Sequence, residues 1–374
     1  MPAKIVLNDF CRQWTDVAED VLAATRRTGE SGWYILGKEV EGFERELAAY
    51  SRTRHAVGCA NGMDAIEIAL RAFGLKAGQR VLTTSLSAFA TTLAIVRAGG
   101  VPVFADVDAH GLLDLDAARA VLAKDPSIKH MVPVHLFGHA LDLGKLDGLR
   151  QEFGLTIVED CCQAIGAAFG DQPVGSVGQA SALSFYPTKN LGAFGDGGAL
   201  LTNDDAIAEA SQTLRNYGQA VRYQHEVIGL NSRLDELHAA VLRTALLPRL
   251  PGWVERRTRI AEAYLAGIHH AGVTVPGAPR GSRSVWHLFP VLVRAAAREA
   301  FREHLLSVGV ATAIHYPVAI SSQNAMRDVP FELPVPLPMT DRYCTSEVSL
   351  PIHPYMTDGE VGQVIEAVNR WQVP

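Results

Sequence analysis

The 374-residue sequence lacks several features that would each have pointed to a particular class of protein. Its five cysteines are odd in number and contain no CxxC pair, which argues against a disulfide framework or a zinc cluster and favours a reducing compartment. No apolar run reaches the roughly 18 residues of a membrane helix, and the opening "MPAKIVLNDF" lacks the apolar core of a signal peptide. We therefore expect a soluble cytoplasmic protein with no membrane partner.

Positive charge is also scarce. The chain carries 34 Lys and Arg against 40 Asp and Glu, a formal net charge of −6. This balance provides no broad basic surface for a nucleic acid, although a local cationic pocket can still hold one phosphate. The GxxxxGK[ST] pattern of a P-loop is absent as well. Nucleic acids are therefore not expected as partners.

The length of the chain predicts two domains. A single hydrophobic core stops growing at roughly 250 to 300 residues, and 48% of this chain is hydrophobic. The composition changes near "LLPRLPGWVERRT", where Pro248 and Pro251 are expected to end a helix. We place a large domain at residues 1–251, with the N-terminal segment, and a smaller C-terminal α/β domain at residues 252–374.

The order of apolar and amphipathic segments predicts an α/β fold. "AVGCANGMDAIEIALRAFG" passes from a short strand through Asn61–Gly62 into a helix, and "RVLTTSLSAFATTLAIVRAGGVPVFADVD" repeats strand, helix and strand. Such alternation is typical of a mainly parallel sheet covered by helices on both faces. Ligands bind these sheets at the carboxyl ends of the strands, so the residues at those ends are the first candidates for chemistry.

Polar side chains stand at several predicted strand ends. Asp160 ends "LTIVED", Gln163 follows it, Ser184 lies in "ALSF", and Gly62 opens a helix. An acid directly after a buried strand is costly unless it meets a cation or several donors. Asp160 is either the N-cap of a helix over "CCQAIGAAF" or the partner of a cationic ring nitrogen.

The stretch "SFYPTKNLGAFGDGG" places Lys189 in a glycine-rich loop, where a lysine is either a solvated charge or a nucleophile. Pyridoxal 5'-phosphate would account for the second alternative. Its aldehyde forms a Schiff base with a lysine, its ring nitrogen pairs with a carboxylate, and its phosphate binds a helix N-terminus and hydroxyl groups. Lys189, Asp160, Ser184 and the turn at residues 61–64 would supply these groups.

Together these segments resemble the DegT/DnrJ/StrS family of nucleotide-sugar aminotransferases, which depend on pyridoxal phosphate and have the type I fold of aspartate aminotransferase. The resemblance runs nearly end to end. The segments that carry it are "SGWYILGKEVEGFERELAAYSRTRHAVGCANGMDAIEIAL", "PVFADVD", "VPVHLFGHALDL", "IVEDCCQAIGA", "SFYPTKNLGAFGDGGALLTND", "GLNSRLDELHAAVL" and "HYPVAI".

The resemblance implies a role for each of five residues. Lys189 would form the Schiff base with the cofactor, Asp160 would pair with its ring nitrogen, and Gln163 would contact its 3'-oxygen. Ser184 would bind the phosphate. Asn231 would reach the phosphate in the neighbouring subunit's site, which implies a homodimer with shared active sites.

The sequence departs from the family pattern in the cofactor-binding segments. Gly62–Met63 stands where relatives have Gly-Thr, so only the backbone N–H of Met63 can serve the phosphate there. Ala88 occupies the usual position of the ring that stacks on the cofactor, and Phe89 follows it, as a stacking ring or as a core residue. His238 replaces a usual glutamine and receives no role.

The remaining candidates would bind substrate. A tyrosine offers a ring and one hydroxyl to a sugar diphosphate, but a structural tyrosine looks the same in sequence. Arg233 would meet a carboxylate or phosphate, or pair with Asp235. His135 and His139 lack metal-ligand spacing, so no metal is expected. The substrate-binding candidates are Tyr34, Tyr186, Tyr217, Arg233 and Tyr316.

The family chemistry would be a transamination in two stages. L-glutamate would leave its amino group on the cofactor and depart as 2-oxoglutarate, and a nucleotide-linked keto sugar would then receive the amine, for a glycan or a natural product. "FYPTKNLGAFGDGG" resembles relatives that act on 3-keto sugars, and a 4-keto substrate is the alternative. Two other functions stay open: a sugar dehydratase, in which the family replaces the lysine by histidine, and a non-enzymatic nucleotide-sugar sensor.

Overall fold

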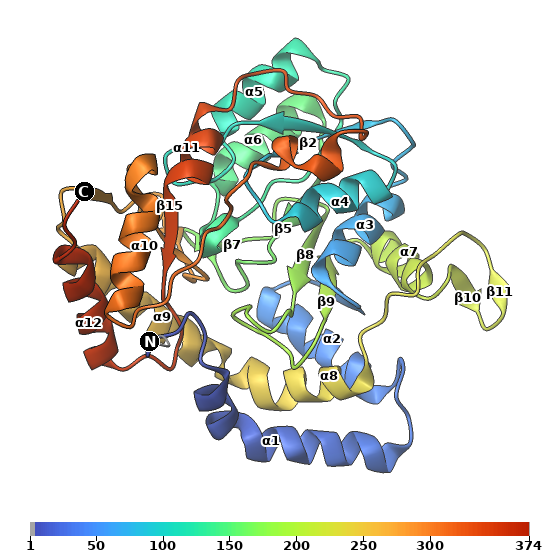
Figure 1. Cartoon of the computed structure of the whole chain (residues 1–374). Helices are drawn as coiled ribbons and strands as arrows, with labels where there is room; N and C mark the ends of the chain where they lie inside the picture. The colour runs from blue at the N-terminus through green and yellow to red at the C-terminus, as the bar shows by residue number, and fades with distance from the viewer. Residues whose placement is uncertain (1–3, 374) are drawn as a thin grey trace.

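The structure is a computed structural model that describes residues 4–373. Figure 1 shows a central sheet flanked by helices, with the C-terminal elements gathered on one side and both chain ends beside them. Within residues 4–373, no helix has both the length and the apolar character that a membrane span requires.

The central sheet has seven strands in the order β1-β9-β8-β5-β4-β2-β3. Neighbours from β8 to β3 run parallel, and β9 is antiparallel to both β1 and β8. This order confirms the predicted mainly parallel sheet. The strands are β1 (His55–Cys59), β2 (Arg80–Thr84), β3 (Val101–Ala105), β4 (His130–Met131), β5 (Thr156–Asp160), β8 (Ala180–Ser184) and β9 (Gly198–Thr202).

Helices cover both faces of this sheet because its strands are apolar on both sides. One face packs against α3 (Gly62–Ala72), α4 (Phe89–Arg97) and α7 (Asp205–Arg215). The other face packs against α5 and α6 at one end of the sheet and against α1, α2 and α8 at the other. These five helices are α1 (Phe10–Ser31), α2 (Lys38–Ser51), α5 (Leu115–Lys124), α6 (Leu143–Phe153) and α8 (Glu236–Val241).

The C-terminal part has its own sheet and core. Strand β14 (Phe289–Val293) lies between β12 (Val273–Thr274) and β15 (Glu347–Leu350), and Ile5 from the N-terminal segment joins this core. The helices are α9 (Leu250–Gly267), α10 (Arg298–Ser307), α11 (Pro338–Ser346) and α12 (Asp358–Asn369). Pro251 lies in the first turn of α9, where its missing N–H costs nothing. The predicted boundary at residue 252 therefore falls inside α9, and the division into domains stays a prediction.

Two small strand groups complete the fold. Strand β6 (Ala168–Phe169) pairs with β7 (Gln172–Pro173) and with β13 (Ser282–Arg283). Strands β10 (Gln219–Val221) and β11 (Gln224–His225) form a hairpin that projects from the body of the molecule in Figure 1. Tyr223 is 77% exposed on this hairpin.

Candidate active site

The predicted strand ends meet where α3 begins. A Cβ atom on Gly62 would lie 2.6 Å from Cys162 Sγ and 2.8 Å from the Cβ of Ser184, so only glycine allows this approach. Asp160 ends β5 next to Ala182 of β8, and Ser184 ends β8 next to Gly198 of β9. The helix N-terminus, the acid and the serine therefore lie at one edge of the sheet.

Asp160 is buried, with 4% of its surface exposed. Its Oδ2 accepts a hydrogen bond from Thr91 Oγ1 at 2.7 Å, and its Oδ1 accepts one from the backbone N–H of Cys162 at 3.0 Å. No helix follows it: residues 161–167 form turns, and Gly166 has a φ of +85°. The alternative role of Asp160 as a helix cap is therefore wrong, and two donors fix the orientation of the buried carboxyl group.

Lys189 lies close to this carboxylate in a tightly folded loop. Burial lowers the pKa of its amine, against the opposing influence of Cys162 and Asp160. A lowered pKa increases the neutral fraction of the amine, which a lysine needs in order to attack a carbonyl. The loop requires glycine at its sharpest point, because a Cβ on Gly192 would lie 2.2 Å from the carbonyl oxygen of Pro187.

The phosphate candidates offer free donors at the start of α3. Asn61 caps the helix by accepting the N–H of Asp64 at 2.8 Å, and within residues 4–373 the backbone N–H groups of Gly62 and Met63 donate to no protein acceptor. The Oγ of half-buried Ser184 accepts the N–H of Tyr186 at 3.3 Å, which leaves its own proton free to donate. These donors fit a phosphate, and with Lys189 and Asp160 they fit pyridoxal phosphate.

Gln163 is held by two partners. Its Oε1 accepts the N–H of Phe137 at 2.7 Å, and its Nε2 donates to the hydroxyl of Tyr316 at 3.1 Å. Burial raises the pKa of Tyr316, so the phenol stays neutral. The structure thus brings Tyr316 to the site, whereas the predicted contact of Gln163 with the cofactor stays a prediction.

Phe89 begins α4 at the same edge of the sheet. Its half-buried ring packs against the small apolar cluster that contains Phe104, Ile320, Met326 and Leu337. This contact supports the interpretation of Phe89 as a core residue. Its stacking role stays a prediction.

Glu159, which precedes Asp160 on β5, belongs to a separate buried hydrogen-bond network. His135 Nε2 donates to its Oε2 at 2.9 Å, and the N–H groups of Gly175, Val177 and Gly178 fill its remaining positions. Burial alone would raise the pKa of Glu159, but these hydrogen bonds outweigh it and lower the pKa. His135 therefore satisfies a local hydrogen bond, as its lack of metal-ligand spacing predicted.

Three of the other substrate candidates are exposed on the single chain, and Arg233 is half-buried. Tyr34, Tyr186 and Tyr217 keep 59%, 52% and 43% of their surface exposed. Arg233 lies over the ring of Tyr217 at 5.0 Å, and its Nη1 donates to Asn216 Oδ1 at 3.1 Å. The alternative pairing of Arg233 with Asp235 does not occur within residues 4–373.

Asn231 is also exposed, and its backbone pairs with Asn216. In the part of the chain that the structure describes, its side-chain amide makes no hydrogen bond. The residues predicted to serve substrate or a second subunit are thus available at the surface.

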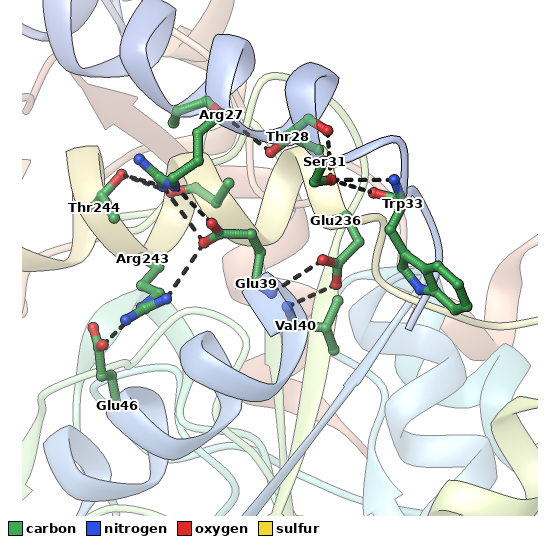
Figure 2. A network of polar contacts seen from close by, with 12 residues as sticks. Arg27, Thr28, Ser31, Trp33, Glu39, Val40, Glu46, Glu236, Arg243 and Thr244 are labelled. Carbon is green, nitrogen blue, oxygen red and sulfur yellow. Dashed lines mark hydrogen bonds and ion pairs between the residues drawn. The ribbon is translucent and has the colours of Figure 1, made fainter. Parts of the chain in front are cut away.

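The turn between Tyr34 and α2 is held by a side chain of α8. Figure 2 shows Glu236 of α8 pointing at the start of α2, where its carboxylate accepts the N–H groups of Gly37, Glu39 and Val40 at 2.8 to 3.0 Å. The same view shows Glu39 between Arg27 and Arg243. These three hydrogen bonds hold the turn that follows exposed Tyr34.

Sequence reasoning missed Thr91, which orients Asp160 although 69 positions separate them. The hydroxyl-rich run "TTSLSAFATT" at a strand end was the available signal. It also missed Cys162, whose thiol has a raised pKa because of burial and the nearby Asp160.

Comparison with known proteins agrees with this geometry. The model of the DegT/DnrJ/EryC1/StrS aminotransferase family matches residues 15–369. A dTDP-3-amino-3,4,6-trideoxy-alpha-D-glucose transaminase of Streptomyces venezuelae is 40% identical, over 97% of this chain and 95% of the relative. The erythromycin biosynthesis sensory transduction protein EryC1 of Saccharopolyspora erythraea is 41% identical, with 96% of each chain covered.

Solved structures show the same fold. The crystal structure of S. venezuelae DesV, in complex with a ketimine intermediate, superposes with a TM-score of 0.93 at 39% identity and 99% coverage of both chains. NtdA of Bacillus subtilis, solved with the bound cofactor PMP, has a TM-score of 0.86 at 27% identity, over 94% of this chain and 81% of its own. The chain therefore belongs to the DegT/DnrJ/EryC1/StrS aminotransferase family and is a pyridoxal-phosphate-dependent aminotransferase.

Proposed function

We propose that this enzyme transfers the amino group of L-glutamate to a 3-keto hexose linked to a nucleotide diphosphate. The products are 2-oxoglutarate and a nucleotide-linked amino sugar. The observation that carries the proposal is that Lys189, whose amine has a lowered pKa, the buried carboxylate of Asp160 and the free N–H groups of α3 lie in one part of the structure.

Different residues of the chain would bind the cofactor and transfer the proton. Pyridoxal phosphate, when bound, supplies an electron sink for the carbanion formed at the carbon that bears nitrogen. Asp160 would face the ring nitrogen of the cofactor, and Thr91 and the Cys162 amide fix the orientation of its carboxyl group. Lys189 would accept a proton from the substrate carbon and return it during the exchange. The N–H of Met63 and the hydroxyl of Ser184 would hold the phosphate.

The 3-position is supported by the loop around Lys189 and by a relative whose name specifies a 3-amino sugar. A 4-keto sugar is the alternative, since both classes place the same cofactor chemistry beside a different sugar carbon. Retention of Lys189 disfavours a dehydratase. The exposed tyrosines Tyr34, Tyr186 and Tyr217, with Arg233, are the proposed contacts for the sugar nucleotide.

We further propose a homodimer in which Asn231 serves the phosphate of the partner's site. Its exposed amide, with no acceptor or donor in the described part of the chain, supports this placement. An exposed amide without a partner in its own chain can donate to a phosphate held by a second copy.

The direct test uses matched pairs of nucleotide-linked sugars that differ only in the position of the ketone, at carbon 3 or carbon 4. We expect one 2-oxoglutarate for each amino sugar formed from the 3-keto member, with the nitrogen at carbon 3 in the NMR spectrum of the product. The Lys189→Ala variant is the control. Faster turnover of the 4-keto members would refute the position, and tight binding without turnover of any member would favour the sensor.

A further inference from the structure

A second set of buried polar side chains approaches the site from the C-terminal sheet. Glu347 and Ser349 lie two residues apart on β15, so their side chains share a face of the strand. Both are fully buried, with 0% of their surface exposed. His315, from the segment that precedes Tyr316, lies against this face. None of these three residues has a role in the function described above.

The three side chains form an unbroken line of hydrogen bonds. The backbone N–H of His315 donates to Glu347 Oε2 at 2.6 Å, and the other oxygen, Oε1, lies 2.5 Å from Ser349 Oγ. Ser349 Oγ in turn lies 2.8 Å from His315 Nδ1. Within residues 4–373, the remaining ring nitrogen, Nε2, has no protein partner.

His315 adjoins the candidate site through its neighbour in the chain, Tyr316. Burial lowers its pKa to about 4, and the charge of Lys189 adds to the effect. The next residue, Tyr316, bonds to Gln163. His315 is therefore a neutral imidazole at physiological pH, and its chemistry depends on which nitrogen carries the single proton.

The hydrogen bonds allow two arrangements of protons. With Glu347 protonated, Oε1–H donates to Ser349, Ser349 donates to His315 Nδ1, and His315 carries its proton on Nε2. With Glu347 ionised, His315 Nδ1–H donates to Ser349, Ser349 donates to Oε1, and Nε2 has a free lone pair. The change moves one proton along each link and releases one proton at Nε2, so the protons balance.

We propose that Glu347, Ser349 and His315 form a proton relay that sets whether His315 Nε2 donates or accepts a proton. Glu347 and Ser349 are positioning residues in this arrangement. The exchange of His315 tautomers requires no substrate and is independent of the proposed function. Only the use of the released proton in the reaction rests on that function.

The pKa of Glu347 lies in a pH range that an experiment on the enzyme can cover. Burial raises its pKa to about 8, although the hydrogen bonds from Ser349 and His315 and the charges of Arg298 and Arg302 on α10 lower it. Below this pH the acid is mainly neutral, and above it the carboxylate predominates. Other titratable groups near Glu347 or His315 are Tyr316, Tyr343, Cys344 and His287.

The test follows the nitrogen resonances of His315 in the cofactor-loaded enzyme, labelled with ¹⁵N-histidine and assigned by comparison with His315→Gln. Between about pH 6 and about pH 10 we expect the proton of the wild-type ring to move from Nε2 to Nδ1 with a midpoint near that of Glu347. In Glu347→Gln the amide oxygen can accept the His315 N–H while its NH₂ group donates to Ser349. This variant should keep the Nε2–H form throughout.

Two further variants separate the relay from a structural effect. Ser349→Ala keeps the acid but removes the link, so His315 should stop responding to the ionisation of Glu347. Glu299→Gln removes an exposed acid on α10 and should titrate as the wild type does. Thermal unfolding identifies any variant that fails to fold. A wild-type ring that does not change tautomer, or a change that persists in both Glu347→Gln and Ser349→Ala, would refute the relay.

The dependence of turnover on pH tests its link to the reaction. We expect the wild-type profile of kcat/KM to contain an ionisation near that of Glu347, and the Glu347→Gln profile to lack it. Identical profiles, with tautomer exchange present only in the wild type, would refute the link while leaving the relay intact. Absence of turnover in every protein would instead refute the proposed function.

Discussion

The two sides of the candidate site differ in how complete they are within one chain. On the buried side, which contains Asp160 and Gln163, Asp160 is 4% exposed and its carboxyl group has two donors. Gln163 has a partner at each end of its amide. On the open side, which contains Tyr34 and Asn231, Tyr34 is 59% exposed and the amide of Asn231 has no partner within residues 4–373. One chain therefore satisfies the polar groups around Asp160 by itself and leaves those of Tyr34 and Asn231 exposed, where we propose that substrate and a second copy bind.

The largest effect is expected from Lys189→Ala. Removing the amine should lower turnover by at least about 10³-fold, because no other residue of the buried side replaces its proton transfer. The fold should remain, as measured by circular dichroism and thermal unfolding. Retention of turnover in this variant would refute the assignment of the nucleophile.

Asp160→Asn should have the next largest effect, roughly 10²- to 10⁴-fold on kcat, because an amide cannot hold the charge that a protonated ring nitrogen requires. Asp106→Asn is the matched control, since Asp106 is a buried acid that accepts from Met339 and Thr340 instead. Equal losses of kcat in both variants would indicate a general effect of removing a buried charge.

Thr91→Val tests whether the buried side depends on orientation as well as charge. Loss of a hydrogen bond to a charged group costs about 1.5 to 3 kcal/mol, so kcat should fall roughly 10- to 100-fold. Thr91→Ser restores the hydroxyl and should recover most of the rate. If the serine variant is as slow as the valine variant, packing rather than the hydrogen bond determines the effect.

Glu236→Gln acts on the open side and should have the smallest effect. The amide can satisfy fewer of the three N–H groups at the start of α2, so the free energy of unfolding should fall by about 1 to 2 kcal/mol. KM for the sugar nucleotide should rise more than kcat falls, because the turn with Tyr34 loosens. Glu46→Gln, which breaks an exposed pair with Arg243, should change stability by less than about 1 kcal/mol. A larger loss in the control would contradict the capping role.

The buried side was largely predictable from sequence. Asp160, Ser184 and Gly62 each stand at the end of a strand or the start of a helix, and the topology of a parallel sheet brings such positions together. Lys189 was identified from the glycine-rich loop, and the structure confirms that glycine is required at Gly192.

Contacts across long separations were not predictable. Tyr316 meets Gln163 from 153 positions away, and Thr91 meets Asp160 from 69 positions away. The helix that one of the two interpretations of Asp160 required does not form, because residues 161–167 make successive turns, with a positive φ at Gly166. His315 meets Glu347 and Ser349, 32 and 34 positions away, because the chain at Ala313 pairs with Ser349 of β15, a contact that no local pattern encodes.

The most direct test of the central claim mixes two inactive variants. If one chain supplies Lys189 and its partner supplies Asn231, heterodimers of Lys189→Ala and Asn231→Ala contain one site with both residues intact. After co-refolding of equal amounts, turnover should return to roughly a quarter of the wild-type rate, because about half of the dimers are mixed and each holds one complete site. The Asn231→Ala homodimer alone must be strongly impaired, and light scattering must show mixed dimers. Under those conditions, turnover no higher than that of the separate variants would contradict the account, since the site would then be built within one chain.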